Sequence, residues 1–157
     1  MIQNLIKKIK SKEYKVGIVG MGYVGLPLAW SFHLNKMPVI GFDIDKSKIS
    51  NLNNGIPYIK HLGKNIMQDL AKSENCHFTD DFSRLAESDS ILMCVPTPLN
   101  KYRNPDMSYV EKTATTISKY LKKGHLIVLE STTYPGTTEE LIVPILEKNS
   151  GLKCSKD

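Results

Sequence analysis

The chain has 157 residues, of which 41% are hydrophobic and 24% charged, a composition typical of one soluble globular domain. No apolar stretch approaches the roughly 20 residues of a membrane-spanning helix, so we expect no membrane partner. Three cysteines without a CxxC pair fit a reducing cytoplasm, where we expect the protein to be. The net charge of +5 is spread along the chain. This spread favours a solvated basic surface over nucleic-acid binding.

Residues 1–14 are predicted to form a leading amphipathic helix. Apolar residues at positions 2, 5, 6 and 9 make one helical stripe. We expect this stripe to pack on the domain or on a partner subunit, and regard attachment to a membrane surface as the weaker alternative.

Residues 15–157 alternate apolar strands with helical segments, which predicts an α/β fold with a doubly wound parallel sheet. The strands are predicted at 15–20, 38–43, 75–78, 90–95 and 125–130, and the helices at 23–35, 46–53, 63–73, 83–86, 108–122 and 137–149. The continuous apolar runs 91–95 and 126–129 indicate central strands. A Rossmann sheet of five or six strands is expected, as part of a longer enzyme.

The glycine-rich segment 20–25 (GMGYVG) follows an apolar run and opens a helical segment. In a dinucleotide-binding loop, Gly20 permits the tight turn, Gly22 lets the backbone approach the pyrophosphate and Gly25 allows close helix packing. The helix N-terminus would present free N–H groups to the anion. The segment therefore predicts dinucleotide binding; a structural turn that happens to carry glycines is the alternative.

Asp43 ends the second predicted strand, close to the ~20-residue separation from Gly25 expected of a ribose-binding acid. A carboxylate accepts both ribose hydroxyls and repels a 2′-phosphate, which favours NAD over NADP. Lys46 and Lys48 complicate this preference, since cations could accept such a phosphate. Helix capping is the alternative role for Asp43, although Asp45 is the better candidate for the cap.

The fourth and fifth predicted strands end in loops rich in hydroxyl and proline residues, at 95–98 and 130–136. Ligands of open α/β sheets bind at the carboxyl ends of strands, so these loops should share an edge with the glycine loop. Thr97, Ser131, Thr132 and Thr133 could then contact a ribose, a phosphate or a water. Loop capping by these hydroxyls is the alternative.

Cys76, Cys94 and Cys154 form no CxxC pair, and the four histidines are scattered. The cysteine spacing does not indicate a disulfide, and neither the cysteines nor the histidines have the spacing of metal ligands, so no metal site is predicted.

Four motifs in order resemble the UDP-glucose/GDP-mannose dehydrogenase family, and its UDP-N-acetylglucosamine 6-dehydrogenases in particular. They are residues 20–29 (GMGYVGLPLA), 95–100 (VPTPLN), 104–108 (NPDMS) and 130–138 (ESTTYPGTT). The resemblance implies an enzyme that oxidises the C6 alcohol of a UDP-sugar to a carboxylate with two NAD⁺, through an aldehyde and a thioester.

The resemblance also suggests roles for individual residues. Thr132 matches the threonine that helps to hold a catalytic water. The family's nucleophilic cysteine and catalytic lysine would follow Asp157, so we expect this chain alone to bind NAD(H) weakly without turnover. The full-length enzyme is expected to be a homodimer or larger. The expected cofactor contacts are Gly20, Gly22, Tyr23, Val24, Gly25, Asp43, Lys48, Val95, Thr97, Ser131 and Thr132.

A non-catalytic NAD(H)-sensing Rossmann module is the main alternative. Such a module needs the glycine loop and Asp43, but it has no use for the loops at 95–98 and 130–136.

Overall fold

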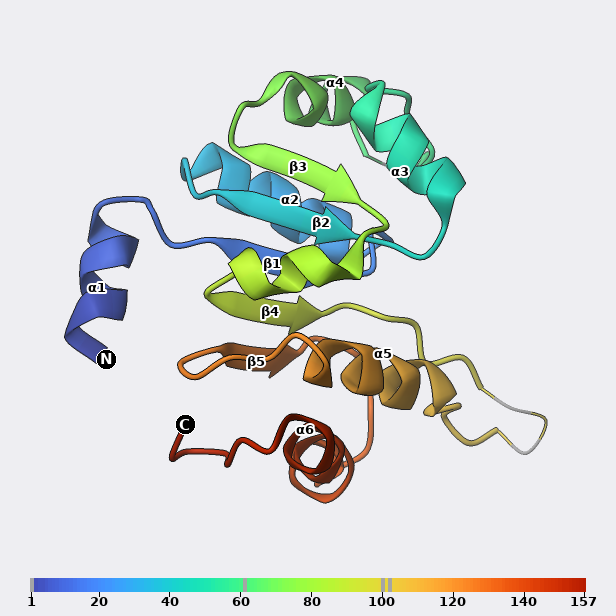
Figure 1. Ribbon diagram of the computed structural model, residues 1–157. Helices are drawn as coiled ribbons and strands as arrows, with labels where there is room; N and C mark the ends of the chain where they lie inside the picture. Colours follow the sequence, from blue (N-terminus) through green and yellow to red (C-terminus); the bar gives the residue numbers. More distant parts are fainter. Residues whose placement is uncertain (1, 61, 100, 102) are drawn as a thin grey trace.

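Five parallel strands form one sheet in the order β3-β2-β1-β4-β5 (Figure 1). The computed structural model describes residues 2–60, 62–99, 101 and 103–157. All five strands lie where the sequence predicts them, and the doubly wound parallel sheet is confirmed. They are β1 Val16–Val19, β2 Val39–Phe42, β3 Cys76–Thr79, β4 Ser90–Met93 and β5 Leu126–Leu129.

Helices connect the strands as parallel pairing requires. The α-helices are α1 Ile2–Lys10, α2 Gly25–Leu34, α3 Lys46–Asn53, α4 Lys64–Lys72, α5 Ser108–Ser118 and α6 Val143–Ser150. A 3₁₀ helix, η1 Phe82–Glu87, precedes β4, and a π-helical turn, η2 Thr138–Ile142, leads into α6. The α5 helix ends earlier than the predicted residue 122, because the next N–H groups, of Lys119 and Tyr120, bond three residues back and tighten the last turn.

Alternation along the strands produces two hydrophobic cores, one on each face of the sheet. On β1, Val16 and Ile18 pack with the α2, α3 and α4 side chains, whereas Val19 packs with α5 and α6. Burial of both faces explains why β1, β2 and residues 91–93 of β4 carry no polar side chain.

The prediction that residues 126–129 form a central strand is wrong. Strand β5 pairs with β4 alone among the described residues, and Leu126 is 56% exposed. Its apolar composition has another cause, because Ile127 and Leu129 pack on one core and Val128 on the other. A continuous apolar run therefore indicates contact with a core on each face of the strand, and does not require a neighbouring strand on each side.

Helix α1 lies apart from the layers that cover the sheet (Figure 1). Leu5 packs against the core, while Ile6 and Ile9 remain 40% and 48% exposed. The ammonium of Lys8 lies 2.6 Å from the Asp89 carboxylate and ties the helix to the residue before β4. Only part of the apolar stripe therefore packs on the domain.

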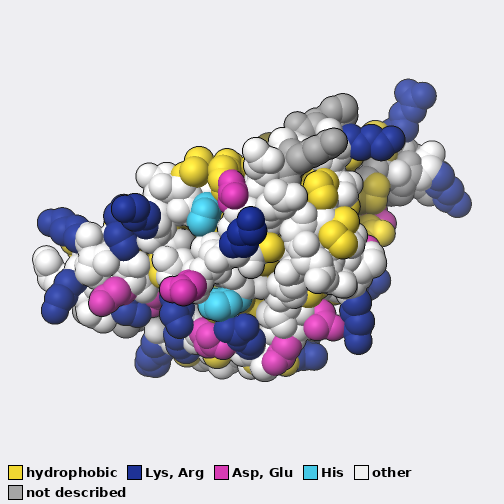
Figure 2. All heavy atoms as spheres, turned by 90° about the horizontal axis from the view of Figure 1, so that it is seen from above, with side chains coloured by type: hydrophobic (Ala, Val, Ile, Leu, Met, Phe, Trp, Pro, Cys, Tyr) yellow, Lys and Arg dark blue, Asp and Glu magenta, His cyan; other side chains and the backbone are white. Residues whose placement is uncertain are grey.

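No helix in the described ranges combines the length and apolarity that a bilayer crossing requires. On the face shown in Figure 2, Lys and Arg side chains are interleaved with acidic and uncharged ones.

Candidate functional site

A cavity of about 980 Å³ opens at the carboxyl edge of the sheet. Its walls come from the segments after β1, β2, β4 and β5, together with one side of α5. The sequence predicted from the parallel direction of the strands that the loops after these four strands would meet, but it did not predict the contribution of α5. The lining includes Gly20, Gly22, Tyr23, Val24, Asp43, Lys48, Val95, Thr97, Ser131 and Thr132, which are ten of the eleven expected cofactor residues.

Gly25, the eleventh, lies behind the cavity wall in the first turn of α2 and is buried. A Cβ atom there would overlap the carbonyl oxygen of Gly20. Gly20 has φ +99°, and a Cβ on it would come within 2.5 Å of the Cys94 carbonyl oxygen. Both glycines are therefore required by the backbone packing of the loop itself.

Gly22 differs from its two neighbours in the motif. A Cβ atom at this position would meet no protein atom within 4 Å, and its φ lies outside the left-handed region. The fold itself therefore does not require glycine here. An absent side chain leaves the backbone open to the cavity, as close approach by a ligand would require.

Asp43 lies at the end of β2 and is 5% exposed. One carboxylate oxygen accepts from the Met21 N–H at 2.9 Å and from the Lys48 ammonium at 3.2 Å, and the other accepts from the Asp45 N–H at 2.9 Å. Three donors occupy part of the roughly four acceptor sites of a carboxylate. Asp43 therefore holds the glycine loop in place and keeps acceptor capacity toward the cavity.

Asp45 caps α3, as the sequence predicted. Its side chain accepts from the backbone N–H of Ser47 at 2.9 Å and from the Ser47 hydroxyl at 2.6 Å. The Ser47 hydroxyl, more than any other group, lowers the pKa of Asp45. Asp43 is therefore not needed as the cap of α3.

Hydroxyl groups join the loops that follow β4 and β5. Thr97 donates to the main-chain carbonyl of Thr132 at 2.7 Å, and Ser131 donates to the carbonyl of Val95 at 2.6 Å. The two bonds make these loops one wall of the cavity. Thr97 and Ser131 thus have a structural use beside the predicted cofactor contact. Asn100, at the end of the motif that contains Thr97, lies outside the described residues.

Cys94 lines the cavity but is 7% exposed. Burial raises the pKa of its thiol to about 12, and the Glu130 carboxylate adds to the increase. A protonated thiol is a poor nucleophile. No group of three or more histidine, cysteine or acidic residues in the described ranges could hold a metal ion.

Sequence reasoning missed the contribution of α5. Tyr109, Lys112, Thr113 and Thr116 line the cavity at helical spacing, while Val110, Ala114 and Ile117 face the core. The 3.6-residue period of the polar positions could have identified this face. Tyr58 was also missed, because it stands in an irregular loop that carries no motif.

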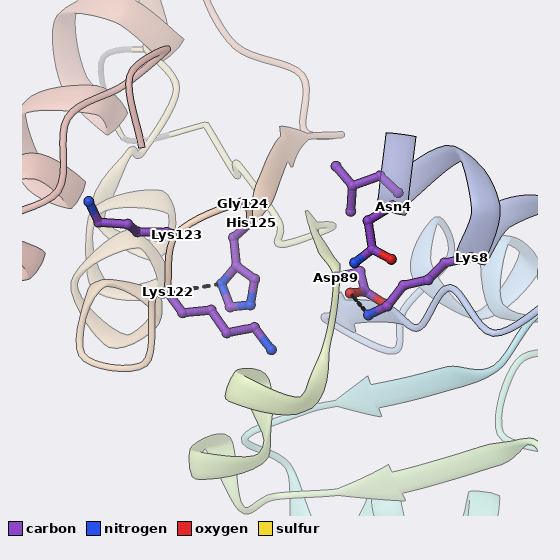
Figure 3. Close-up of a pocket in the computed structure, with 8 residues that line it drawn as sticks. Asn4, Lys8, Asp89, Lys122, Lys123, Gly124 and His125 are labelled. Carbon is purple, nitrogen blue, oxygen red and sulfur yellow. Dashed lines mark hydrogen bonds and ion pairs between the residues drawn. The ribbon is translucent and has the colours of Figure 1, made fainter. Parts of the chain in front are cut away.

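A second cavity, of about 210 Å³, lies at the opposite edge of the sheet (Figure 3). Its cations already have protein partners: Lys8 bonds to Asp89, and Lys122 donates to the Ala86 carbonyl. Lys123 pairs with Asp157 at 2.7 Å. Its carboxylate, Asp89, already accepts from Lys8 and from the Lys15 N–H.

Comparisons with known proteins agree with the motifs. The model of the NAD binding domain of the UDP-glucose/GDP-mannose dehydrogenase family matches residues 14–157. Protein CapL of Staphylococcus aureus is 42% identical over 142 residues, which are 90% of this chain and 32% of that protein. A UDP-N-acetyl-D-glucosamine 6-dehydrogenase of Pseudomonas aeruginosa is 40% identical over 146 residues, 93% of this chain and 34% of the relative.

Among solved structures, an NDP-N-acetyl-D-galactosaminuronic acid dehydrogenase from Methanosarcina mazei Go1 superposes with a TM-score of 0.84. The two sequences are 37% identical, and the match covers 98% of this chain and 35% of the other. The chain therefore spans about a third of the length of the relatives that it matches.

Proposed function

The chain belongs to the UDP-glucose/GDP-mannose dehydrogenase family, and we propose that it is the NAD-binding part of a nucleotide-sugar 6-dehydrogenase. The reaction is oxidation of the C6 alcohol of a UDP-N-acetylhexosamine to the uronic acid with two NAD⁺. Family membership assigns NAD binding to this domain. We propose the substrate and the activity of the whole enzyme.

The open backbone at Gly22 is the observation that carries the proposal. Packing explains glycine at positions 20 and 25, but not at 22. A pyrophosphate that approaches the main chain at the start of α2 does explain it, since a methyl group would stand in its path. The loop therefore fits the phosphate part of a dinucleotide.

The cavity supplies suitable partners for the rest of the cofactor. The remaining acceptor site of Asp43 suits a ribose hydroxyl, and Lys48 can donate beside it. NAD⁺, when bound, supplies the hydride acceptor. Thr132 is the proposed holder of the catalytic water, and Thr97 fixes its main chain. The further proposed contacts are Tyr23, Val24, Val95 and Ser131.

The cysteines of this chain do not suit a thioester step. Burial raises the pKa of the Cys76 and Cys94 thiols, and Cys154 does not line the cavity. We therefore expect the 157-residue chain to bind NAD(H) without oxidising a UDP-sugar. Steady NADH production from NAD⁺ and a UDP-sugar by this chain alone would overturn that expectation.

UDP-N-acetylglucosamine is the proposed sugar nucleotide. Relatives named UDP-N-acetyl-D-glucosamine 6-dehydrogenase are 40% and 38% identical to this chain. Relatives named UDP-N-acetyl-D-mannosamine dehydrogenase are 34%, 33% and 37% identical.

Calorimetric titration of the chain with NAD⁺ and NADP⁺ tests the cofactor site. The wild type should prefer NAD⁺, and Asp43→Ala should lose that preference together with at least about tenfold in NAD⁺ affinity, or 1.4 kcal/mol. Asp81→Ala is the control for the loss of a helix-capping carboxylate, because Asp81 caps η1 through Ser83 and does not line the cavity. Equal NAD⁺ binding by wild type and Asp43→Ala would reduce Asp43 to a structural residue.

A further inference from the structure

Met21, between the first two glycines of the loop, is held through three of its groups: its side chain, its N–H and its carbonyl. Its side chain is fully buried against β2, where a Cβ at Gly41 would come 2.7 Å from the Met21 sulfur. Its N–H donates to Asp43 at 2.9 Å. Its carbonyl accepts from the hydroxyl of Tyr58 at 2.7 Å.

Tyr58 belongs to the irregular segment between α3 and α4, 37 positions along the chain from Met21. Its ring is half-buried, packs against the core on the α2 face and forms part of the cavity wall. The hydroxyl therefore reaches the glycine loop from a segment to which no motif assigns a role.

The carbonyl of Met21 and the N–H of Gly22 belong to one peptide unit. That unit is planar and trans, so the two groups point in opposite directions. A hydrogen bond that fixes the carbonyl toward Tyr58 consequently fixes the direction of the Gly22 N–H. Gly22 is also the residue whose backbone is open to the cavity.

We propose that Tyr58 is a positioning residue of the cofactor site, whose hydroxyl orients the Met21–Gly22 peptide so that the Gly22 amide can donate to the cofactor pyrophosphate. This inference rests on the proposed function. Tyr58 acts through the loop and needs no contact of its own with the nucleotide.

The protonation state of Tyr58 suits this role. Burial raises the pKa of its phenol well above the ordinary value, and the carboxylates of Asp43 and Asp45 add to the increase. The hydroxyl therefore stays a donor to Met21 throughout the neutral and mildly alkaline range.

Tyr58→Phe removes the hydroxyl and keeps the ring. Calorimetry with NAD⁺ should show about three- to tenfold weaker binding than wild type, the effect of one hydrogen bond. The ¹H–¹⁵N spectrum of the unliganded variant should show a displaced Gly22 amide resonance, which a general loss of packing would not select. Tyr14→Phe is the matched control, since Tyr14 is a buried tyrosine that precedes β1 and does not line the cavity.

Unchanged NAD⁺ affinity in Tyr58→Phe would overturn the inference. So would a weakening that Tyr14→Phe reproduces, or one without a shift of the Gly22 resonance. Failure of the wild type itself to bind NAD⁺ would overturn the proposed function instead, and the wild-type titration separates the two cases.

Discussion

The carbonyl oxygen of Gly20 occupies the space that a Cβ atom at Gly25 would need. The strand-to-helix turn is therefore closed by contact between two glycine backbones. Gly25→Ala should displace the start of α2 and lower the free energy of unfolding by about 1–3 kcal/mol, as overpacking does. Urea unfolding followed by circular dichroism measures this loss, and a variant as stable as wild type would contradict it.

Gly22→Ala should leave the stability of the fold unchanged and weaken cofactor binding. Because the new methyl group meets no protein atom, the midpoint of thermal unfolding should stay near the wild-type value. Its NAD⁺ affinity should fall by at least about tenfold, since the methyl group projects where the pyrophosphate is proposed to lie. A stable variant with wild-type affinity would remove Gly22 from the proposed site.

The hydroxyl bonds between the β4 and β5 loops should contribute to stability unequally. Ser131→Ala removes a half-buried donor to Val95 and should cost about 1 kcal/mol. Thr97→Val removes a more exposed bond to Thr132 and should cost less. Hydrogen exchange should rise in residues 94–98 and 130–134 of both variants, and unchanged exchange there would show that the loops hold together without these hydroxyls.

Loss of the Asp89 carboxylate should lower the free energy of unfolding by more than loss of its ion pair with Lys8 alone. Burial alone would raise the pKa of Asp89, but the hydrogen bonds from Lys8 and from the Lys15 N–H outweigh it and leave the pKa lowered. Its contribution to stability is therefore present above the ordinary value of 3.8 and is lost as pH falls through the lower folded value. Asp89→Ala also leaves the Lys15 N–H unsatisfied and should cost about 1–3 kcal/mol.

Lys8→Met is the control for this prediction, because it removes the cation alone. Urea unfolding at pH 7 should place its stability between those of wild type and Asp89→Ala. Equal losses in the two variants would assign the whole effect to the ion pair.

His125 should make the fold less stable in mild acid. Burial lowers the pKa of its imidazole, and Lys122 adds to the decrease, so the folded chain resists protonation more than the unfolded chain does. Stability should therefore fall as pH drops through the ordinary value of 6.5, until the folded form is protonated as well. His125→Gln, which keeps a donor for the Ser88 carbonyl, should show a smaller fall between pH 8 and pH 5.5.

Thermal unfolding across this pH range measures the effect. His77→Gln is the matched control, since His77 lies exposed on β3. If His77→Gln flattens the pH dependence as much as His125→Gln does, the cause lies outside the His125 pocket.

Much of the architecture follows from patterns local in the sequence. The alternation of strand and helix patterns correctly predicted all five strands, and the capping residue Asp45 marked the start of α3. The edge position of β5 could not be predicted in this way. Each face of β5 contacts one core, and these contacts produce the same apolar pattern at the edge as at the centre of a sheet.

The sequence by itself determined the fold class, the family and the edge of the sheet at which the glycine loop, Asp43 and the hydroxyl loops meet. These properties depend on periodicity, glycine spacing and parallel strand direction, which are written along the chain. Only the tertiary structure decided that a Cβ atom at Gly22 would meet no protein atom, whereas one at Gly25 would overlap the backbone. Only the tertiary structure, too, placed the Asp43 carboxylate at the N–H of Met21 and the Tyr58 hydroxyl at its carbonyl. Those relationships join segments far apart in sequence. The direction of the Met21–Gly22 peptide plane cannot be predicted from the residue types next to it in the sequence.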